Sequence, residues 1–192
     1  MKKIITLVCL LALISLPAYA KKDAAWVVKK AKAEDDSFAK QKTVTFPEIN
    51  YRQMGGEVKE YTGVSVWKSP AFKYKIVAIE KDGQPLEFKI EVADARANLA
   101  GNKNFNNYSK ALDKDGSTLK FISGVQFDPE QGDALKHPLK EEHFSIVLDK
   151  AYLVSHRETG IVIKVYGESE SPVFHISPWY VDGVLKYFEG AK

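Results

Sequence analysis

Cysteine is almost absent from this sequence of 192 residues, since Cys9 is the single one. One cysteine excludes an internal disulfide and a cluster of thiolate ligands for a metal ion. Attachment of a lipid to Cys9 is disfavoured, because the bulky Val8 precedes it where a small residue is required and the apolar run before it is short. The stability of the fold must therefore come from packing and hydrogen bonds.

The chain also has few arginines and a small net charge. The chain has 28 Lys and Arg residues against 25 Asp and Glu residues, a formal net charge of +3, and its arginines are Arg52, Arg96 and Arg157. A charge balance this close to neutral argues against nucleic-acid binding, which needs a dense basic surface. The scattered arginines argue against an arginine cluster that recognises phosphate or carboxylate groups.

No apolar run in the sequence is long enough to span a bilayer, yet the first 20 residues have a distinctive pattern. Lys2 and Lys3 precede an apolar stretch from Ile4 to Ile14, and Ala18-Tyr19-Ala20 follows Pro17. This order is typical of a secretory signal peptide cleaved after Ala20. We therefore expect a periplasmic or secreted protein with no transmembrane segment after cleavage. Cleavage leaves 26 of the 28 basic residues against 25 acidic ones, a net charge of +1.

The remaining chain is divided into two parts. Residues 21–42 are expected to form a leader helix and linker, and residues 43–192 a single β-rich domain. Asp23 is a suitable N-cap for a short helix with Val27 and Val28 on its apolar side. Such a helix suits either a membrane-surface or partner-docking role or a frayed leader, and its small apolar side favours the leader.

Alternating hydrophobicity indicates a β structure for the middle of the chain. Apolar residues from Leu86 to Val92 alternate with charged ones, which is typical of a strand with one buried face. The run from Tyr74 to Glu80 precedes it across a turn at 81–85 and predicts a hairpin. A second hairpin is predicted for Tyr108–Leu112 and Thr118–Ile122.

The turn of this second hairpin, Asp113-Lys114-Asp115-Gly116-Ser117, also has carboxylates at spacings that occur in calcium loops. The first and twelfth ligand positions of an EF-hand would fall on Ala111 and Ile122, which cannot coordinate a cation. A plain Asp-Gly turn is the favoured interpretation.

The C-terminal third has the clearest pattern. It predicts a strand ending at Leu148, a short helix capped by Asp149, a hairpin of Ile161–Tyr166 and Val173–Ile176, and a helix that starts at Ser177-Pro178. The apolar residues of this last helix have i, i+3, i+4, i+7 spacing: Val181, Val184, Leu185 and Phe188. We expect an α+β fold, mainly antiparallel β and sandwich-like, with a C-terminal packing helix.

Residues of this half of the chain also carry a family resemblance. They are Tyr108–Phe121 with its Asp-Gly turn, Leu148–Leu153, Thr159-Gly160-Ile161, Ile163–Gly167, and Pro178-Trp179-Tyr180 leading to Gly183 and Leu185. In this order the chain resembles a group of small exported proteobacterial proteins without an assigned activity. The resemblance implies export and a β-rich fold, and it implies no activity. Some members carry a cysteine pair before the strand that ends at Leu148, and this chain does not.

Two groups of residues are candidates for ligand binding. In the irregular segment before the second hairpin, Asn104 and Asn107 stand beside Phe105 and Tyr108, and amide and aromatic groups of this kind bind sugars or extended peptides. The alternative is a surface loop in which Asn and Gly simply tolerate turn conformations. Trp179 and Tyr180, in the first turn of the last helix, either line a pocket or seal the edge of the core.

The histidines leave room for an enzyme. His137 and His143 flank Glu141 and Glu142, and His175 lies on a separate strand. Imidazole and carboxylate groups suit zinc or copper. The spacing matches no zinc protease motif, and strand parity points His143 and His175 away from the buried face. We therefore predict no catalytic residue, no metal site and no cofactor.

The sequence favours an exported accessory or binding protein of the bacterial envelope, non-catalytic, whose partner is an envelope protein or a glycan. The alternative is a small periplasmic hydrolase or metal-dependent enzyme that uses histidine and carboxylate residues.

Overall fold

The computed structural model describes residues 22–54, 57–60, 71–97, 105–127 and 139–190. Within these residues the chain forms three helices, α1 (Ala24–Lys30), α2 (Lys150–Ser155) and α3 (Pro178–Glu189). It also forms eleven strands, which are β1 (Lys32–Asp36), β2 (Gln41–Thr45), β3 (Ile49–Met54), β4 (Glu57–Glu60), β5 (Ala71–Lys81), β6 (Glu87–Ala97), β7 (Lys110–Asp113), β8 (Thr118–Phe127), β9 (Leu139–Leu148), β10 (Ile161–Tyr166) and β11 (Val173–Ile176).

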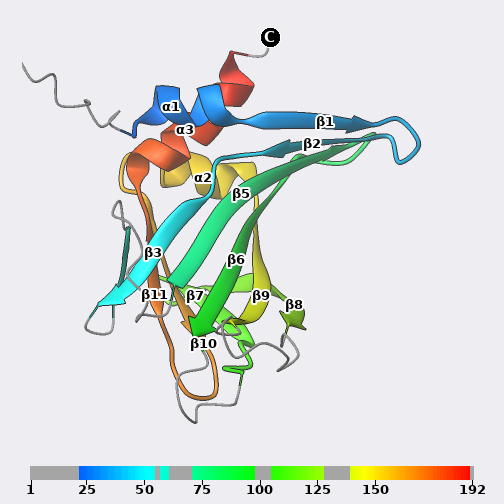
Figure 1. Ribbon diagram of the computed structural model, residues 1–192. Helices are drawn as coiled ribbons and strands as arrows, with labels where there is room; N and C mark the ends of the chain where they lie inside the picture. The colour runs from blue at the N-terminus through cyan, green and yellow to red at the C-terminus, as the bar shows by residue number, and fades with distance from the viewer. Residues whose placement is uncertain (1–21, 55–56, 61–70, 98–104, 128–138, 191–192) are drawn as a thin grey trace, which may run out of the picture.

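The strands form one curled, half-barrel sheet, with the helices gathered at one end of it (Figure 1). One edge of the long strand β5 pairs with β3 at residues 71–74 and with β2 at residues 77–81. The other edge of β5 pairs with β6. From β6 the antiparallel pairing continues through β9, β8, β7, β10 and β11. β11 pairs in parallel with β4, which pairs with β3.

This architecture confirms the mainly antiparallel β structure with a C-terminal helix, but it does not confirm a sandwich. Alternation along β6 and β9 shows that one face of each strand is buried, and pairs such as Ile90 with Ile146 put those faces together. Alternation cannot tell whether a second sheet or the curl of the same sheet covers that face. Here the curl and α3 cover it.

The N-terminal segment differs from the expected leader and linker. Asp23 caps α1 as predicted, since its Oδ1 accepts a hydrogen bond from the Trp26 N–H at 2.8 Å. The chain then continues into β1 and β2, which extend the sheet next to β5. α1 packs on α3, where a Cβ added to Gly183 would lie 2.5 Å from the Cβ of Val27. The helix is therefore docked within its own chain.

α3 follows the predicted pattern and closes the helical end of the sheet. Pro178 occupies its first turn, and Val181, Val184 and Leu185 are buried against the strands. Phe188 is partly buried and packs on the ring of Phe88 at 5.7 Å. An apolar stripe on a helix laid across the open side of a curled sheet removes both surfaces from water.

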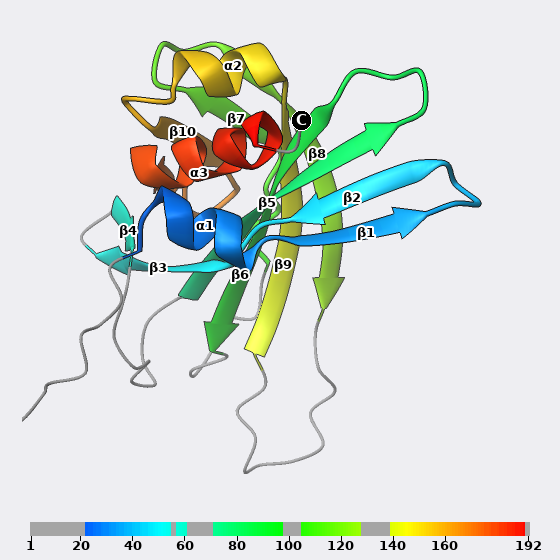
Figure 2. The same ribbon diagram turned by 90° about the horizontal axis from the view of Figure 1, so that it is seen from above.

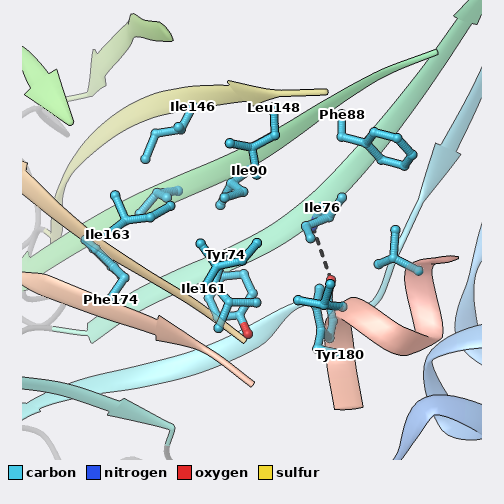
Figure 3. Close-up of a cluster of buried hydrophobic side chains, with 14 of the residues drawn as sticks. Tyr74, Ile76, Phe88, Ile90, Ile146, Leu148, Ile161, Ile163, Phe174 and Tyr180 are labelled. Carbon is cyan, nitrogen blue, oxygen red and sulfur yellow. Dashed lines mark hydrogen bonds between the residues drawn. The ribbon is translucent and has the colours of Figure 1, made fainter. Parts of the chain in front are cut away.

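Tyr180 connects α3 to a break in the sheet (Figure 3). Pro47 lies between β2 and β3, where the chain leaves one half of β5 and joins the other. The Tyr180 hydroxyl accepts a hydrogen bond from the Ile76 N–H at 3.2 Å and donates one to the Pro47 carbonyl at 2.8 Å. Backbone groups at the break therefore find a partner on the helix.

Candidate ligand-binding site

The candidate site is built around a buried carboxylate on β9. Glu142 has the same strand parity as Phe144, so its side chain points to the inner face, and the residue is only 6% exposed. One carboxylate oxygen accepts the N–H groups of Asn106 at 2.8 Å and Asn107 at 3.1 Å, and the other accepts the Tyr108 N–H at 2.7 Å. A carboxylate that accepts three backbone donors fixes the path of the segment that supplies them.

A second buried carboxylate holds the ring of Tyr108. Asp94 on β6 is the register partner of Glu142 and also points inward. Its Oδ2 accepts a hydrogen bond from the Tyr108 hydroxyl at 2.9 Å, and the ring packs on Phe144 with a centroid separation of 4.9 Å. Tyr108 is thus held at both its backbone and its hydroxyl, beneath the surface.

Asn106 connects this segment to the turn between β10 and β11. Its buried Oδ1 accepts the N–H groups of Ser169 at 2.8 Å and Glu170 at 2.9 Å, while Nδ2 donates to the Glu170 carbonyl at 2.9 Å. The turn approaches so closely that a Cβ added to Gly167 would lie 2.2 Å from Nδ2 of Asn106. Residues 106–108 are therefore fixed by buried polar contacts to β9 on one side and to the turn between β10 and β11 on the other.

Asn107 lies between these anchors and faces solvent. Its backbone is in the left-handed region, with φ at 49°, a conformation that asparagine adopts more readily than most residues other than glycine. Its Nδ2 donates to Oε2 of Glu168 at 2.8 Å, and its Oδ1 accepts from Nε2 of Gln126 at 2.8 Å. Three polar side chains from three separate segments thus form one hydrogen-bonded row, which we call the amide row.

The amide row borders an open pocket of about 480 Å³ at the end of the half-barrel opposite the helices. Its lining residues come from the 105–109 segment, β8, β9 and the turn after β10, and they are Asn107, Tyr108, Ser109, Ser123, Gly124, Gln126, Glu142, His143, Gly167 and Glu168. His143 is half exposed, and its Nε2 lies 3.1 Å from Oε2 of Glu141. The pocket offers amide, hydroxyl, carboxylate and imidazole groups, which together donate and accept hydrogen bonds in many directions.

The structure separates the residues that the sequence proposed for ligand binding. Asn107 and Tyr108 line the pocket, and Phe105 is half-buried close by in the chain. Asn104 lies outside the described residues. Tyr108 is 4% exposed, so it supports the pocket more than it presents its ring.

Trp179 and Tyr180 lie at the helical end of the molecule, away from this pocket. Tyr180 is fully buried in the core. Trp179 is partly buried beside Trp26, with ring centroids 6.2 Å apart, and borders a second open pocket with Arg157 and Asp182. The packing of both rings fits the alternative that they seal the edge of the core.

From the sequence, Glu142 was considered only as a metal ligand beside the histidines, and Gln126 and Glu168 were overlooked. A signal for Glu142 was available, because it shares the parity of the apolar residues of β9, and a charged residue at such a position must find partners. Gln126 and Glu168 gave no signal, since both are polar residues near turns.

The histidines do not form a metal centre among the described residues. His143 and His175 are exposed on their strands, as parity predicted, and His137 lies outside the part of the chain that the structure describes. Within that part, no group of three or more His, Cys, Asp or Glu residues is placed to hold a metal ion. No helix there has the length and apolar character needed to cross a membrane.

The Asp113 turn is an ordinary Asp-Gly turn. Oδ1 of Asp113 accepts hydrogen bonds from the N–H groups of Asp115 at 3.0 Å and Ser117 at 2.8 Å, and Gly116 has φ at 84°. The aspartate oxygen therefore stabilises the turn itself, as the favoured interpretation requires. A second acidic segment, residues 128–133, suits either a cation site or a solvated bend on sequence grounds, and it lies outside the described residues.

No family model, no curated protein and no solved structure matches this chain.

Proposed function

We propose that the protein is an exported, non-catalytic binding protein of the bacterial envelope that binds a glycan in the pocket beside the amide row. The observation that carries the proposal is the fixed position of Asn107. Asparagine adopts the left-handed conformation more readily than most residues, so the conformation itself does not mark a site. The position of Asn107 is fixed by the buried contacts on either side of it, which are the hydrogen bonds from Asn106 and Tyr108 to Glu142 and those from the turn after β10 to Asn106.

The chemistry of the pocket favours a sugar. Hydroxyl groups of sugars both donate and accept hydrogen bonds, and planar amide and carboxylate side chains satisfy them in pairs. Asn107, Gln126 and Glu168 provide such groups in a row that is already ordered, so little side-chain freedom is lost on binding. The envelope location rests on the signal-peptide pattern of residues 1–20.

The binding test uses calorimetric titration with soluble peptidoglycan fragments and with neutral oligosaccharides. Asn107→Gly suits the left-handed backbone and removes the amide, so we expect the fold to be retained and affinity to fall about tenfold or more. Gln126→Ala should act in the same direction. Gln84→Ala, in the exposed turn between β5 and β6, is the matched control and should bind as the wild type does. Equal binding by all three variants, or no binding to any of these glycans, would overturn the proposal.

Export is tested separately by fractionation and intact mass. The expected product is a periplasmic or secreted chain that begins at Lys21. An acylated chain that begins at Cys9, or an uncleaved chain in the cytoplasm, would contradict this part of the proposal.

A further inference from the structure

β1 and β2 form a hairpin that projects from the body of the molecule (Figure 2). Its turn is well formed, since Oδ1 of Asp36 accepts the N–H groups of Phe38 and Ala39, both at 3.0 Å, and Lys40 takes a left-handed φ of 48°. At the tip, Phe38 is 100% exposed. One exposed apolar side chain is ordinary at a protein surface, so the case for an interaction depends on the strand that leads to this tip.

β1 is also an open edge of the sheet. All five of its residues, Lys32 to Asp36, are exposed, and among the described strands it pairs only with β2. The backbone N–H and C=O groups on the outer side of an edge strand are a template for another strand.

We propose that β1 pairs antiparallel with β1 of a second copy of this chain, with Ala33 on the two-fold axis. An antiparallel pair related by a two-fold axis through the sheet places one residue opposite itself. With Ala33 at that position, each Lys32 faces Glu34 of the second copy, so two pairs of opposite charge form across the strands.

The neighbouring registers are disfavoured by charge. A pairing centred on Glu34 brings each Lys32 opposite Asp36 but places two carboxylates opposite each other at the axis, and one centred on Lys32 places two ammonium groups opposite each other. Only the register centred on Ala33 combines opposite-charge pairs with no like-charge pair. The charge order of β1 therefore selects the register centred on Ala33, where the small side chain also lets the strands approach. In this register the hairpin tip with Phe38 extends past Ala31 of the second copy toward its α1.

Four of the five residues of β1 are charged, which protects the edge from unrelated strands. A five-residue pairing also buries little surface, so the dimer should be weak and should form reversibly at high protein concentration. A covalent trap placed at the axis detects such a dimer.

The trap is Ala33→Cys, made together with Cys9→Ala so that the introduced thiol is the only one whether or not residues 1–20 are cleaved. Directly opposed residues of antiparallel strands have Cα atoms roughly 4.5 to 5.5 Å apart, within the range that a disulfide spans. We expect a disulfide-linked dimer after mild oxidation. Lys42→Cys in the same background is the control, because Lys42 is exposed on β2, which is paired on both edges.

Charge reversal tests the register. Lys32→Glu replaces both attractions by repulsions, and we expect the dissociation constant from sedimentation to rise about tenfold. Lys32→Glu combined with Glu34→Lys restores the pairs in reversed order and should restore the dimer. Three results would each overturn the proposal: a chain that stays monomeric at millimolar concentration, a Lys42→Cys variant that cross-links as efficiently as the Ala33→Cys variant, or a double charge variant that fails to restore the dimer.

Discussion

The two ends of the half-barrel are closed by opposite kinds of contact. At the helical end, the apolar side chains of Val181, Val184 and Leu185 on α3 cover the sheet. The Tyr180 hydroxyl supplies hydrogen bonds to backbone groups at the break between β2 and β3. At the pocket end, Glu142 and the side chain of Asn106 hold an irregular segment through hydrogen bonds to its backbone and to a neighbouring turn. The first end is closed by burial and the second by polar contacts.

The difference has a functional meaning. Apolar packing is non-directional, so changes that conserve the packed volume usually cost little stability. Buried hydrogen bonds are directional and costly to leave unmade, so a segment that they hold keeps one conformation. The polar end is therefore suited to present Asn107 to a ligand, and the apolar end is suited to hold the fold together.

The largest expected effect comes from the apolar end. Leu185→Ala removes a buried side chain and leaves a cavity between α3 and the sheet, which should lower the free energy of unfolding by about 2 to 5 kcal/mol. Urea denaturation measures this loss. The pocket lies at the other end, so glycan affinity of the folded variant should be retained.

Lys186→Ala is the matched control on the exposed side of the same helix. Lys186 pairs with Asp182 at 2.8 Å with i, i+4 spacing, and we expect its loss to cost only about 0.3 to 0.5 kcal/mol. An equal cost for both variants would show that α3 is not held by its apolar face.

The next effect comes from the polar end. Glu142→Gln keeps the shape of the side chain but replaces one acceptor oxygen by an amide that faces a backbone N–H. We expect a loss of about 1 to 3 kcal/mol, together with faster amide hydrogen exchange at Asn106, Asn107 and Tyr108.

Glu91→Gln serves as the control for this charge change, because Glu91 is a half-exposed partner of Lys75 on the outer face. It should change stability by less than about 0.5 kcal/mol. If Glu142→Gln cost as little stability as Glu91→Gln and left amide exchange unchanged, the hydrogen bonds to Glu142 would not fix the conformation of residues 106–108.

The two ends also differ in how well the sequence predicts them. The hairpin β5–β6, the capped helix α2 and the helix α3 were predicted closely, because hydrophobic period, turn residues and caps are local signals. The half-barrel was not predicted, since the curl depends on pairing between distant strands. Strand β1 was missed because its five exposed, mostly charged residues lack an alternating pattern.

The candidate site was predicted only in part for the same reason. Asn107 and Tyr108 were identified from amides and aromatic rings in an irregular segment. Their partners Gln126, Glu142 and Glu168 lie 19 to 61 residues away in the chain, and only the fold brings them together. The residues that form the buried hydrogen bonds at the pocket end each resemble ordinary surface residues in the sequence, so sequence patterns alone do not reveal this arrangement.

Two buried tyrosine hydroxyls should contribute differently to the stability of the fold, and this difference is a smaller effect than those above. Tyr180→Phe leaves the Ile76 N–H and the Pro47 carbonyl without their helix partner and should cost about 1 to 2 kcal/mol. The Tyr152 hydroxyl is buried with no hydrogen-bond partner among the described residues, so Tyr152→Phe should change stability by less than about 0.5 kcal/mol. Burial, helped by Asp113 and Asp115, raises the pKa of Tyr152 to about 12.

Thermal unfolding of the two Phe variants measures this difference. Equal costs would mean that the Tyr180 hydroxyl contributes nothing at the break between β2 and β3, and that the ring alone matters.

The smallest effect concerns ion pairs at the surface of the helical end. Arg157 Nε lies 2.8 Å from Asp182, and its two terminal nitrogens lie 2.8 and 3.1 Å from the carboxylate of Glu189. Partial burial acts to raise the pKa of Asp182, but hydrogen bonds from Lys186 and Arg157 outweigh it and hold that pKa below its ordinary 3.8. The hydrogen bond from Arg157 likewise lowers the pKa of Glu189 below 4.5.

A carboxyl group whose pKa is lowered by folding stabilises the fold above its ordinary pKa, and this contribution is lost as the pH falls through the lowered value. Arg157→Gln should therefore lower the melting temperature slightly at neutral pH, and the difference from wild type should shrink below about pH 4. Lys75→Gln, which breaks the half-exposed pair with Glu91, is the control and should change the melting temperature little at neutral pH. Because solvent screens all of these groups, the effect stays below that of the buried contacts, and a difference that persists unchanged at low pH would mean that Arg157 acts through packing of its side chain and not through its charge.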